Sequence, residues 1–473
     1  MKNKRSISKK ALWLTLFFVC LLGATRIFAQ TETLTLSQAV ELALKADYQV
    51  ITDTNNLEKA KLAVKKEVLD IFPKADIEGQ YQYQTAESTY PSAFQIVVKE
   101  TIPAFNLYGQ RIVSAIEATM WDQVLYQAAL LISQADVIYN TYQDYINILK
   151  AQQVLRLQEE AVKYYKEANI LAEKQLGLGK ITKPDQLKAE NYLNQAQYDL
   201  EKSRSDLDIA LEILANQIGL NDLSGYVFEE IGSEPESLVQ ELSDIQKKAL
   251  QRRLEIQKSD INLKKAQRIW AQNKNKELPE LLLSYNNQNN NQSFGLSYNF
   301  LNGDFSWLAA QKSQGYQSDI TSRDSDSSNY FGANQRYFTL KLSWSLDFGS
   351  TVNETKLSQY SVENVKVDLE KERHNILVEV KQAWSNYHLA VKQWELNQKS
   401  LPYYEKDWEI KQLQNKLGMI TYTDLMTARQ NALEAQINAV KSGYDKLLTF
   451  QKLKKVAGDL YPFDHQTTAE VKR

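Results

Sequence analysis

A short motif that occurs twice constrains this chain more than any other feature of its sequence. One copy runs from Leu178 to Ala189, and the other runs from Leu417 to Ala428. In each copy a Gly is available for the left-handed residue that ends an incoming helix. A Thr three positions before an Asp then supplies an N-cap and a first-turn carboxylate for the next helix. Each motif therefore predicts the tip of a helical hairpin.

Long helical segments flank both motifs. Residues 109–177 contain no internal proline or glycine, and a helix of that length would extend about 100 Å at 1.5 Å per residue. The returning helix is expected over 183–219. The second hairpin is expected over 352–417 and 423–458, with a kink at Pro402. Helices this long need a packing partner. Small residues that recur every seven positions indicate coiled-coil packing: Ala189, Ala196, Ser203 and Ala210, then Ala428, Ala435, Ser442 and Thr449.

The two hairpins are interpreted as copies of one ancestral unit. Residues 179–219 and 418–458 are identical at 12 of 41 positions without a gap. The helix-ending prolines Pro73 and Pro279 are 206 residues apart, whereas the two tips are 239 residues apart. The second copy is therefore 33 residues longer between its first strand and its long helix. The predicted organisation is a signal peptide over 1–29, a first repeat over 30–234 (strands about 73–102, hairpin 109–219) and a second repeat over 235–473 (strands about 280–348, hairpin 352–458).

Residues 1–29 have the composition of a secretory signal peptide. Basic residues precede the apolar run 11–24, and Ala29 offers a small residue for cleavage. The run is shorter than the roughly 20 residues that a membrane-spanning helix needs. Cleavage would remove Cys20, the only cysteine, and would leave 50 basic and 58 acidic residues, a formal charge of −8. That charge argues against a nucleic-acid partner.

Alternation of apolar and polar residues predicts four β-strands. Two are expected within 73–102, and two more over 281–302 and 337–348, with a Ser-, Asp- and Gly-rich loop between the second two. A soluble, half-buried sheet is one interpretation. Export, outward apolar residues and many aromatics favour the other, an outer-membrane barrel. Because the smallest membrane barrels have about eight strands, such a barrel would be shared between chains.

These features together resemble the TolC-like outer-membrane efflux proteins. The resemblance rests on the segment Leu34–Val40, on the helix-to-strand junctions at Pro73 and Pro279, and on the duplicated Gly-x-Ile-Thr-x-x-Asp tips. It implies a mainly α fold with a membrane β-barrel, in which the duplicated helical hairpins form an α-barrel. It further implies a homotrimer, with four strands per chain contributing to a trimeric 12-stranded barrel.

The resemblance also implies a function and a location. The protein would be a passive exit duct of a tripartite efflux pump or a type I secretion system. It would lie in the outer membrane of a Gram-negative bacterium and extend into the periplasm. Its partners would be outer-membrane lipid, a periplasmic adaptor (membrane fusion protein) and an inner-membrane pump of RND or ABC type. A non-conducting structural tether across the periplasm is the alternative.

Site residues are carried over from the family by position at the two tips. Asp424 corresponds to an acid that rings the tunnel mouth, and Thr427 occupies the position of the second ring acid. Ile420 stands where the family has a gate-locking basic residue, so the usual lock is not expected here. Asp185, the counterpart of Asp424, has the alternative of being only a first-turn helix acid. Adaptor contact is expected at Gly179, Lys180, Ile181, Thr182, Gly418, Met419, Ile420 and Thr421.

No pattern in the sequence predicts an enzyme. The three histidines, His374, His388 and His465, have no cysteine partners and no metal-ligand spacing. No Gly-rich phosphate loop or nucleophile elbow is present in the sequence. Catalytic, cofactor-binding and metal sites are therefore not expected.

Overall fold

The computed structural model describes residues 33–69, 72, 74–80, 93–103, 115–231, 241–288, 292–300, 303–312, 335–344 and 349–460. The predicted signal peptide, residues 1–29, lies outside the described residues. The chain divides into two compact units. Unit 1 comprises residues 1–47, 136–239 and 385–452, and unit 2 comprises 48–135, 240–384 and 453–473.

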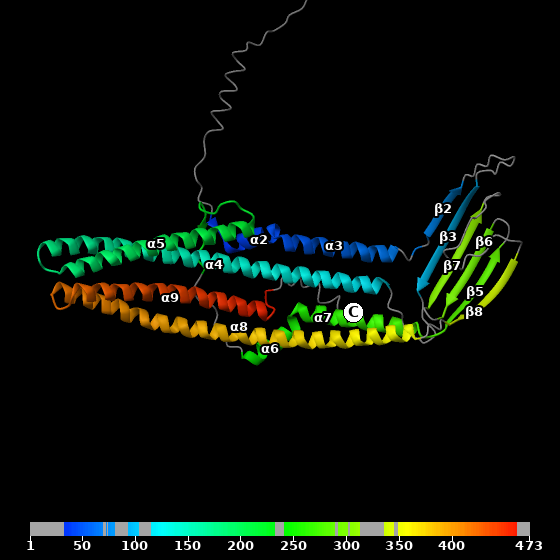
Figure 1. Cartoon of the computed structure of the whole chain (residues 1–473). Helices are drawn as coiled ribbons and strands as arrows, with labels where there is room; N and C mark the ends of the chain where they lie inside the picture. Colours follow the sequence, from blue (N-terminus) through cyan, green and yellow to red (C-terminus); the bar gives the residue numbers. More distant parts are fainter. Residues whose placement is uncertain are drawn as a thin grey trace, which may run out of the picture. The chain divides into compact units, whose positions relative to one another are not determined.

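Two helical hairpins pass through unit 1 (Figure 1). In the first, α4 (Ala115–Gly177) returns as α5 (Lys183–Ile218). In the second, α8 (Ser350–Lys416) returns as α9 (Tyr422–Val456), and α8 continues through Pro402. The two returning helices begin within one residue of the positions predicted from the sequence, and the predicted start of the first hairpin, 109–114, lies outside the described residues. The small residues predicted to lie in their seams are largely buried: Ala189, Ala196, Ser203, Ala428, Ala435 and Ser442.

Unit 1 also contains a short pair of parallel strands. β1 (Thr33–Leu34) pairs with β4 (Val227–Phe228). A capping box of Thr35 and Gln38 begins α2 (Leu36–Ala46). Tyr145 of α4 is fully buried beneath the pair, and its hydroxyl donates to the carbonyl oxygens of Leu34 and Glu229 at 2.8 and 3.1 Å. One side chain thus holds two distant chain segments against α4.

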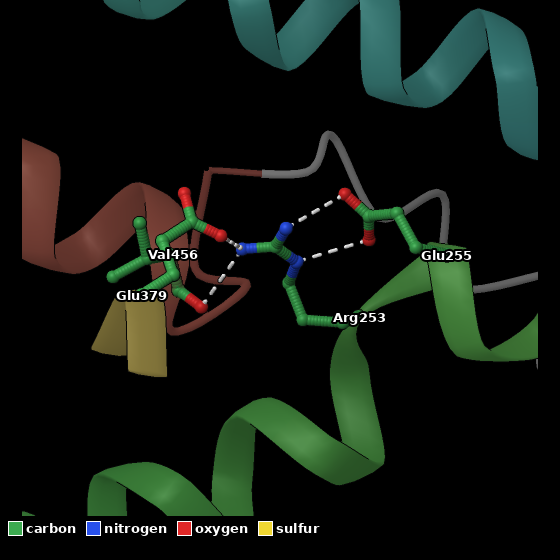
Figure 2. A network of polar contacts seen from close by, with 4 residues as sticks. All are labelled: Arg253, Glu255, Glu379 and Val456. Atoms are coloured by element: carbon green, nitrogen blue, oxygen red, sulfur yellow. Dashed lines mark hydrogen bonds and ion pairs between the residues drawn. The ribbon is translucent and has the colours of Figure 1, made fainter. Parts of the chain in front are cut away.

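Unit 2 contains α3 (Tyr48–Leu69), α6 (Leu242–Arg252), α7 (Leu254–Asn275) and the first parts of α4 and α8. At the junction of α6 and α7, the Arg253 guanidinium makes a two-pronged pair with Glu255, both N–O distances being 2.9 Å (Figure 2). Its third nitrogen donates to Glu379 of α8 at 3.0 Å and to the Val456 carbonyl at 3.3 Å. A cation placed on a helix-terminal carbonyl stabilises that end. Arg253 therefore connects the last turn of α9 to both α7 and α8.

A six-stranded antiparallel sheet completes unit 2. Its strands lie in the order β2-β3-β7-β6-β5-β8, and it is open, with β2 and β8 at its edges. Figure 1 shows β2 and β3 beside strands that come much later in the chain. The strands are β2 (Lys74–Gln80), β3 (Ala93–Pro103), β5 (Glu280–Gln288), β6 (Gln292–Asn299), β7 (Asp304–Lys312) and β8 (Gln335–Ser343).

The prediction of four strands per chain was wrong, because the sheet has six. The segment 281–302 holds two short strands, β5 and β6, that pair with each other with Tyr285 opposite Leu296. The segment expected to be a loop contains β7, where Phe305 and Trp307 continue the alternation on the same face as Tyr298 and Leu296. The Ser-, Asp- and Gly-rich residues that follow this strand made the whole segment resemble a loop. A 12-stranded trimer therefore does not follow from this chain.

Among the residues that the structure describes, none of the helices combines the length and the apolar character needed to cross a membrane.

Candidate gate and docking tips

The two hairpin tips have the same backbone geometry. Gly179 and Gly418 adopt left-handed φ angles of 70° and 72°. The amide after each Gly donates back to a helix carbonyl, Lys180 to Gln175 and Met419 to Gln414, both at 2.9 Å. This is the pattern of a Gly-ended helix. Open space surrounds both glycines, so the backbone conformation rather than crowding requires Gly here.

A capping box begins the helix after each tip. The Thr182 hydroxyl and amide donate to one Asp185 oxygen at 2.6 and 3.1 Å, and the Thr421 hydroxyl and amide donate to one Asp424 oxygen at 2.7 and 3.2 Å. The threonine hydroxyl, followed by the threonine amide, holds the pKa of each carboxyl below its usual range. Both acids are therefore anions at neutral pH.

The two acids differ in exposure and in their further contacts. Asp424 is exposed at the tip, whereas Asp185 is half-buried. The second Asp185 oxygen accepts a hydrogen bond of 3.4 Å from the Thr423 hydroxyl of the other hairpin. Asp185 is thus more than a first-turn acid, because it also connects the two hairpins. Asp424 leaves its charge exposed to solvent.

The residues predicted to contact an adaptor fall into two groups. Ile181 and Ile420 are half-buried and pack against the hydrophobic cluster below the tips. The other six are exposed, and one of them, Met419, has an apolar side chain that is 70% exposed. Two neighbouring apolar side chains, Leu178 and Leu417, are also at least 70% exposed. Leu178 and Leu417 were not among the predicted contact residues. Their position directly before each tip Gly is the signal that would have identified them.

Three hydroxyl contacts join the two hairpins just behind the tips. We call them the tip contacts. The Tyr422 hydroxyl donates to the Ala168 carbonyl of α4 at 2.7 Å, and the Tyr422 side chain is buried. The Tyr192 and Thr427 hydroxyls lie 3.3 Å apart, and Thr423 reaches Asp185 as described above. Burial raises the pKa of Tyr422, so that its hydroxyl stays a neutral donor.

A buried arginine reinforces the tip contacts. Arg429 of α9 is 7% exposed, and its guanidinium carbon lies 4.5 Å from the Trp408 ring centre of α8 and 5.1 Å from the Tyr164 ring centre of α4. A desolvated cation on aromatic faces contributes about 2 kcal/mol. Both hairpins supply a ring, so Arg429 holds them together. No sequence pattern indicated this residue, because its aromatic neighbours are far away along the chain.

A family model matches the second half of the chain. Residues 245–459 match the family model described as outer membrane efflux protein. This segment is similar to that family. No curated protein matches the chain.

Solved structures of outer-membrane channels share the fold of this chain. The Campylobacter jejuni CmeC outer membrane channel is 17% identical, with a TM-score of 0.64 over 92% of this chain and 88% of that chain. The open state of the Neisseria gonorrhoeae MtrE outer membrane channel is 14% identical, with a TM-score of 0.66 over 90% and 89%. The Vibrio cholerae outer membrane protein VceC is 13% identical, with a TM-score of 0.65 over 89% and 96%.

The fold brings most of the predicted site residues to the two tips. Thr427 is exposed one turn from Asp424, where its hydroxyl also donates to the Thr423 carbonyl at 3.0 Å. Ile420 is half-buried and packs against the hydrophobic cluster. Within the described part of the chain there is no group of three His, Cys, Asp or Glu side chains arranged to hold a metal ion.

Proposed function

We propose that this protein is the passive exit duct of a tripartite efflux pump or a type I secretion system. It lies in the outer membrane of a Gram-negative cell as a homotrimer and conducts cargo from the periplasm to the exterior. A periplasmic adaptor and an RND or ABC pump engage its tips. The observation that carries the proposal is the joining, in one chain, of a sheet with an exposed apolar face to two long helical hairpins.

The apolar face of the sheet supports insertion into lipid. Leu283 lies opposite Leu340 and Tyr285 lies opposite Phe338 in the β5–β8 pair, so all four share one face. Phe338, Leu340 and Leu342 are 77%, 68% and 69% exposed. The other face of the sheet is mostly polar, as with Ser284 opposite Thr339, although Leu282 and Leu308 also lie on it. An apolar band on one face and polar residues on the other is typical of outer-membrane strands.

The tips support a gate that opens when an adaptor binds. The exposed Leu178, Leu417 and Met419 are apolar contact points that a partner could cover. At the position of the family's basic gate-locking residue this chain has Ile420. In our proposal the tip contacts and Arg429 perform the locking role instead. They join the two hairpins within one chain, so hairpin separation breaks them. We infer that they favour the closed duct.

The charge of Asp424 provides a test of its position at the gate. In a trimer, three exposed carboxylates near the tunnel mouth attract cations. We expect Asp424→Asn to lower the cation-over-anion permeability ratio of the reconstituted pore by about twofold or more, since a charged ring sets such selectivity. The measurement is the reversal potential in a salt gradient across a planar bilayer.

Asp185→Asn is the matched control, because both substitutions remove the charge from an equivalent capping box. Asp185 is half-buried, so this variant is expected to leave selectivity near the wild-type value. Equal selectivity changes in the two variants, or none in either, would remove Asp424 from the gate.

A further inference from the structure

The second copy contains a β-hairpin that has no counterpart among the described residues of the first copy. The chain between the helix-ending proline and the tip glycine is longer in the second copy, from Pro279 to Gly418, than in the first, from Pro73 to Gly179. The hairpin of β6 and β7 runs from Gln292 to Lys312, within the longer of these two segments. It therefore accounts for most of the added length.

This hairpin lies inside the sheet rather than at its edge. β7 pairs with β3 from Gln95 opposite Lys312 to Pro103 opposite Asp304. β6 pairs with β5 from Leu282 opposite Asn299 to Gln288 opposite Ser293. All pairs are antiparallel, so β3 and β5 run in opposite directions and could pair directly if the hairpin were removed. Insertion of two strands between them keeps the alternation of strand direction.

The hairpin also continues both faces of the sheet. On the apolar face, Leu296 lies between Tyr285 of β5 and Trp307 of β7, and Ala309 lies opposite Val98 of β3. Glu100 interrupts this face, and its carboxylate accepts a hydrogen bond of 3.1 Å from the Trp307 indole.

On the polar face the hairpin places serines beside the polar residues of its neighbours. Ser297 lies opposite both Ser284 and Ser306. The Ser306 hydroxyl lies 3.0 Å from that of Thr101 of β3. A plug within a water-filled lumen is not expected to have one largely apolar face, and a free extracellular loop would not pair with strands on both sides. The strand pairing on both sides is what a strand within the wall of a barrel requires.

We infer that the β6–β7 hairpin is part of the membrane wall of the duct, so that each copy supplies six strands. The inference rests on the proposed function. An unpaired strand edge is costly in lipid. The edge strand β8 runs antiparallel to β2, so β8 of one copy can pair with β2 of the next. Three copies then close a ring of eighteen strands, about 1.5 times as wide as one with four strands per copy, because diameter grows roughly linearly with strand number.

Spin labels on single cysteines test this assignment in the full protein. Cys20 is the only cysteine and lies in the predicted signal peptide, so each substitution creates a unique site in the processed chain. Leu296→Cys and Ser297→Cys place labels on opposite faces of β6. Leu340→Cys and Thr339→Cys do the same on β8 and serve as matched controls. The protein is reconstituted in phosphatidylcholine liposomes, and label relaxation by oxygen and by a water-soluble nickel chelate is compared.

We expect the label at position 296 to behave as the label at 340 does, with oxygen relaxing it at least threefold more strongly than the nickel chelate. Labels at 297 and 339 should show the reverse preference. Nickel access at 296 while 340 stays in lipid would overturn the inference and make the hairpin a plug or loop. Nickel access at both 296 and 340 would instead overturn the proposed function, and the inference with it.

Discussion

Replacing Tyr422 with Phe should shift the duct toward its open state about fivefold. The substitution removes the hydroxyl that donates to the Ala168 carbonyl at 2.7 Å and keeps the buried ring. A hydrogen bond of this kind contributes about 1 kcal/mol, and about 1.4 kcal/mol is a tenfold change in an equilibrium. Tyr422→Ala should open the duct further, because it also empties a position in the hydrophobic cluster that contacts α4 and α5.

Ion flux from liposomes that contain the reconstituted protein measures this shift. Tyr403→Phe is the matched control, because Tyr403 lies on α8 and is 67% exposed. We expect the control to match wild type, while Tyr422→Phe raises the flux per inserted trimer. Equal flux from Tyr422→Phe and wild type, with Tyr422→Ala also unchanged, would show that the tip contacts do not hold the gate.

Truncation of Tyr145 should be the most destabilising single substitution in the part of unit 1 that holds the β1–β4 pair. The Tyr145 side chain is fully buried, its ring lies 5.4 Å from that of Phe228, and its hydroxyl serves two carbonyls. Removal of a buried aromatic ring costs about 3–5 kcal/mol. Tyr145→Phe loses only the hydroxyl contacts, so we expect about 1–2 kcal/mol for that variant.

Chemical denaturation followed by the helical circular dichroism signal gives these free energies of unfolding. Tyr198→Ala is the control, since Tyr198 is on α5 and is 65% exposed, and its loss should cost less than about 0.5 kcal/mol. A Tyr145→Ala variant as stable as Tyr198→Ala would mean that Tyr145 does not hold the two segments against α4.

The helical part of the fold could be predicted from the sequence because its signals are local. The Gly-x-Ile-Thr-x-x-Asp motifs specify both a left-handed Gly and a capping box within a few residues. The long proline-free runs then define the hairpins. The division into repeats at residues 234 and 235 stays a prediction, as does cleavage after Ala29.

The sheet and the tip contacts depend on long-range partners and were harder to predict. β7 is followed by a long Ser-, Asp- and Gly-rich stretch, and the strand is recognised only through its pairing with β3, which lies much earlier in the chain. In the sequence, Arg429 is indistinguishable from other basic residues of a helix. Its contacts with Trp408 and Tyr164 form only in the folded chain. The gate role of Asp424 and the adaptor contacts at the tips stay predictions. The structure adds a reason to test them, since Asp424 is exposed where Asp185 is not.

Single-channel recording tests the claim of an exit duct most directly. Wild type and Tyr422→Phe are inserted into planar lipid bilayers as detergent-purified protein. We predict discrete current steps of equal size in both, with longer openings in the variant. Bilayers in which both proteins are present as inserted trimers, yet neither gives current steps, would contradict the account and leave a structural tether as the remaining explanation.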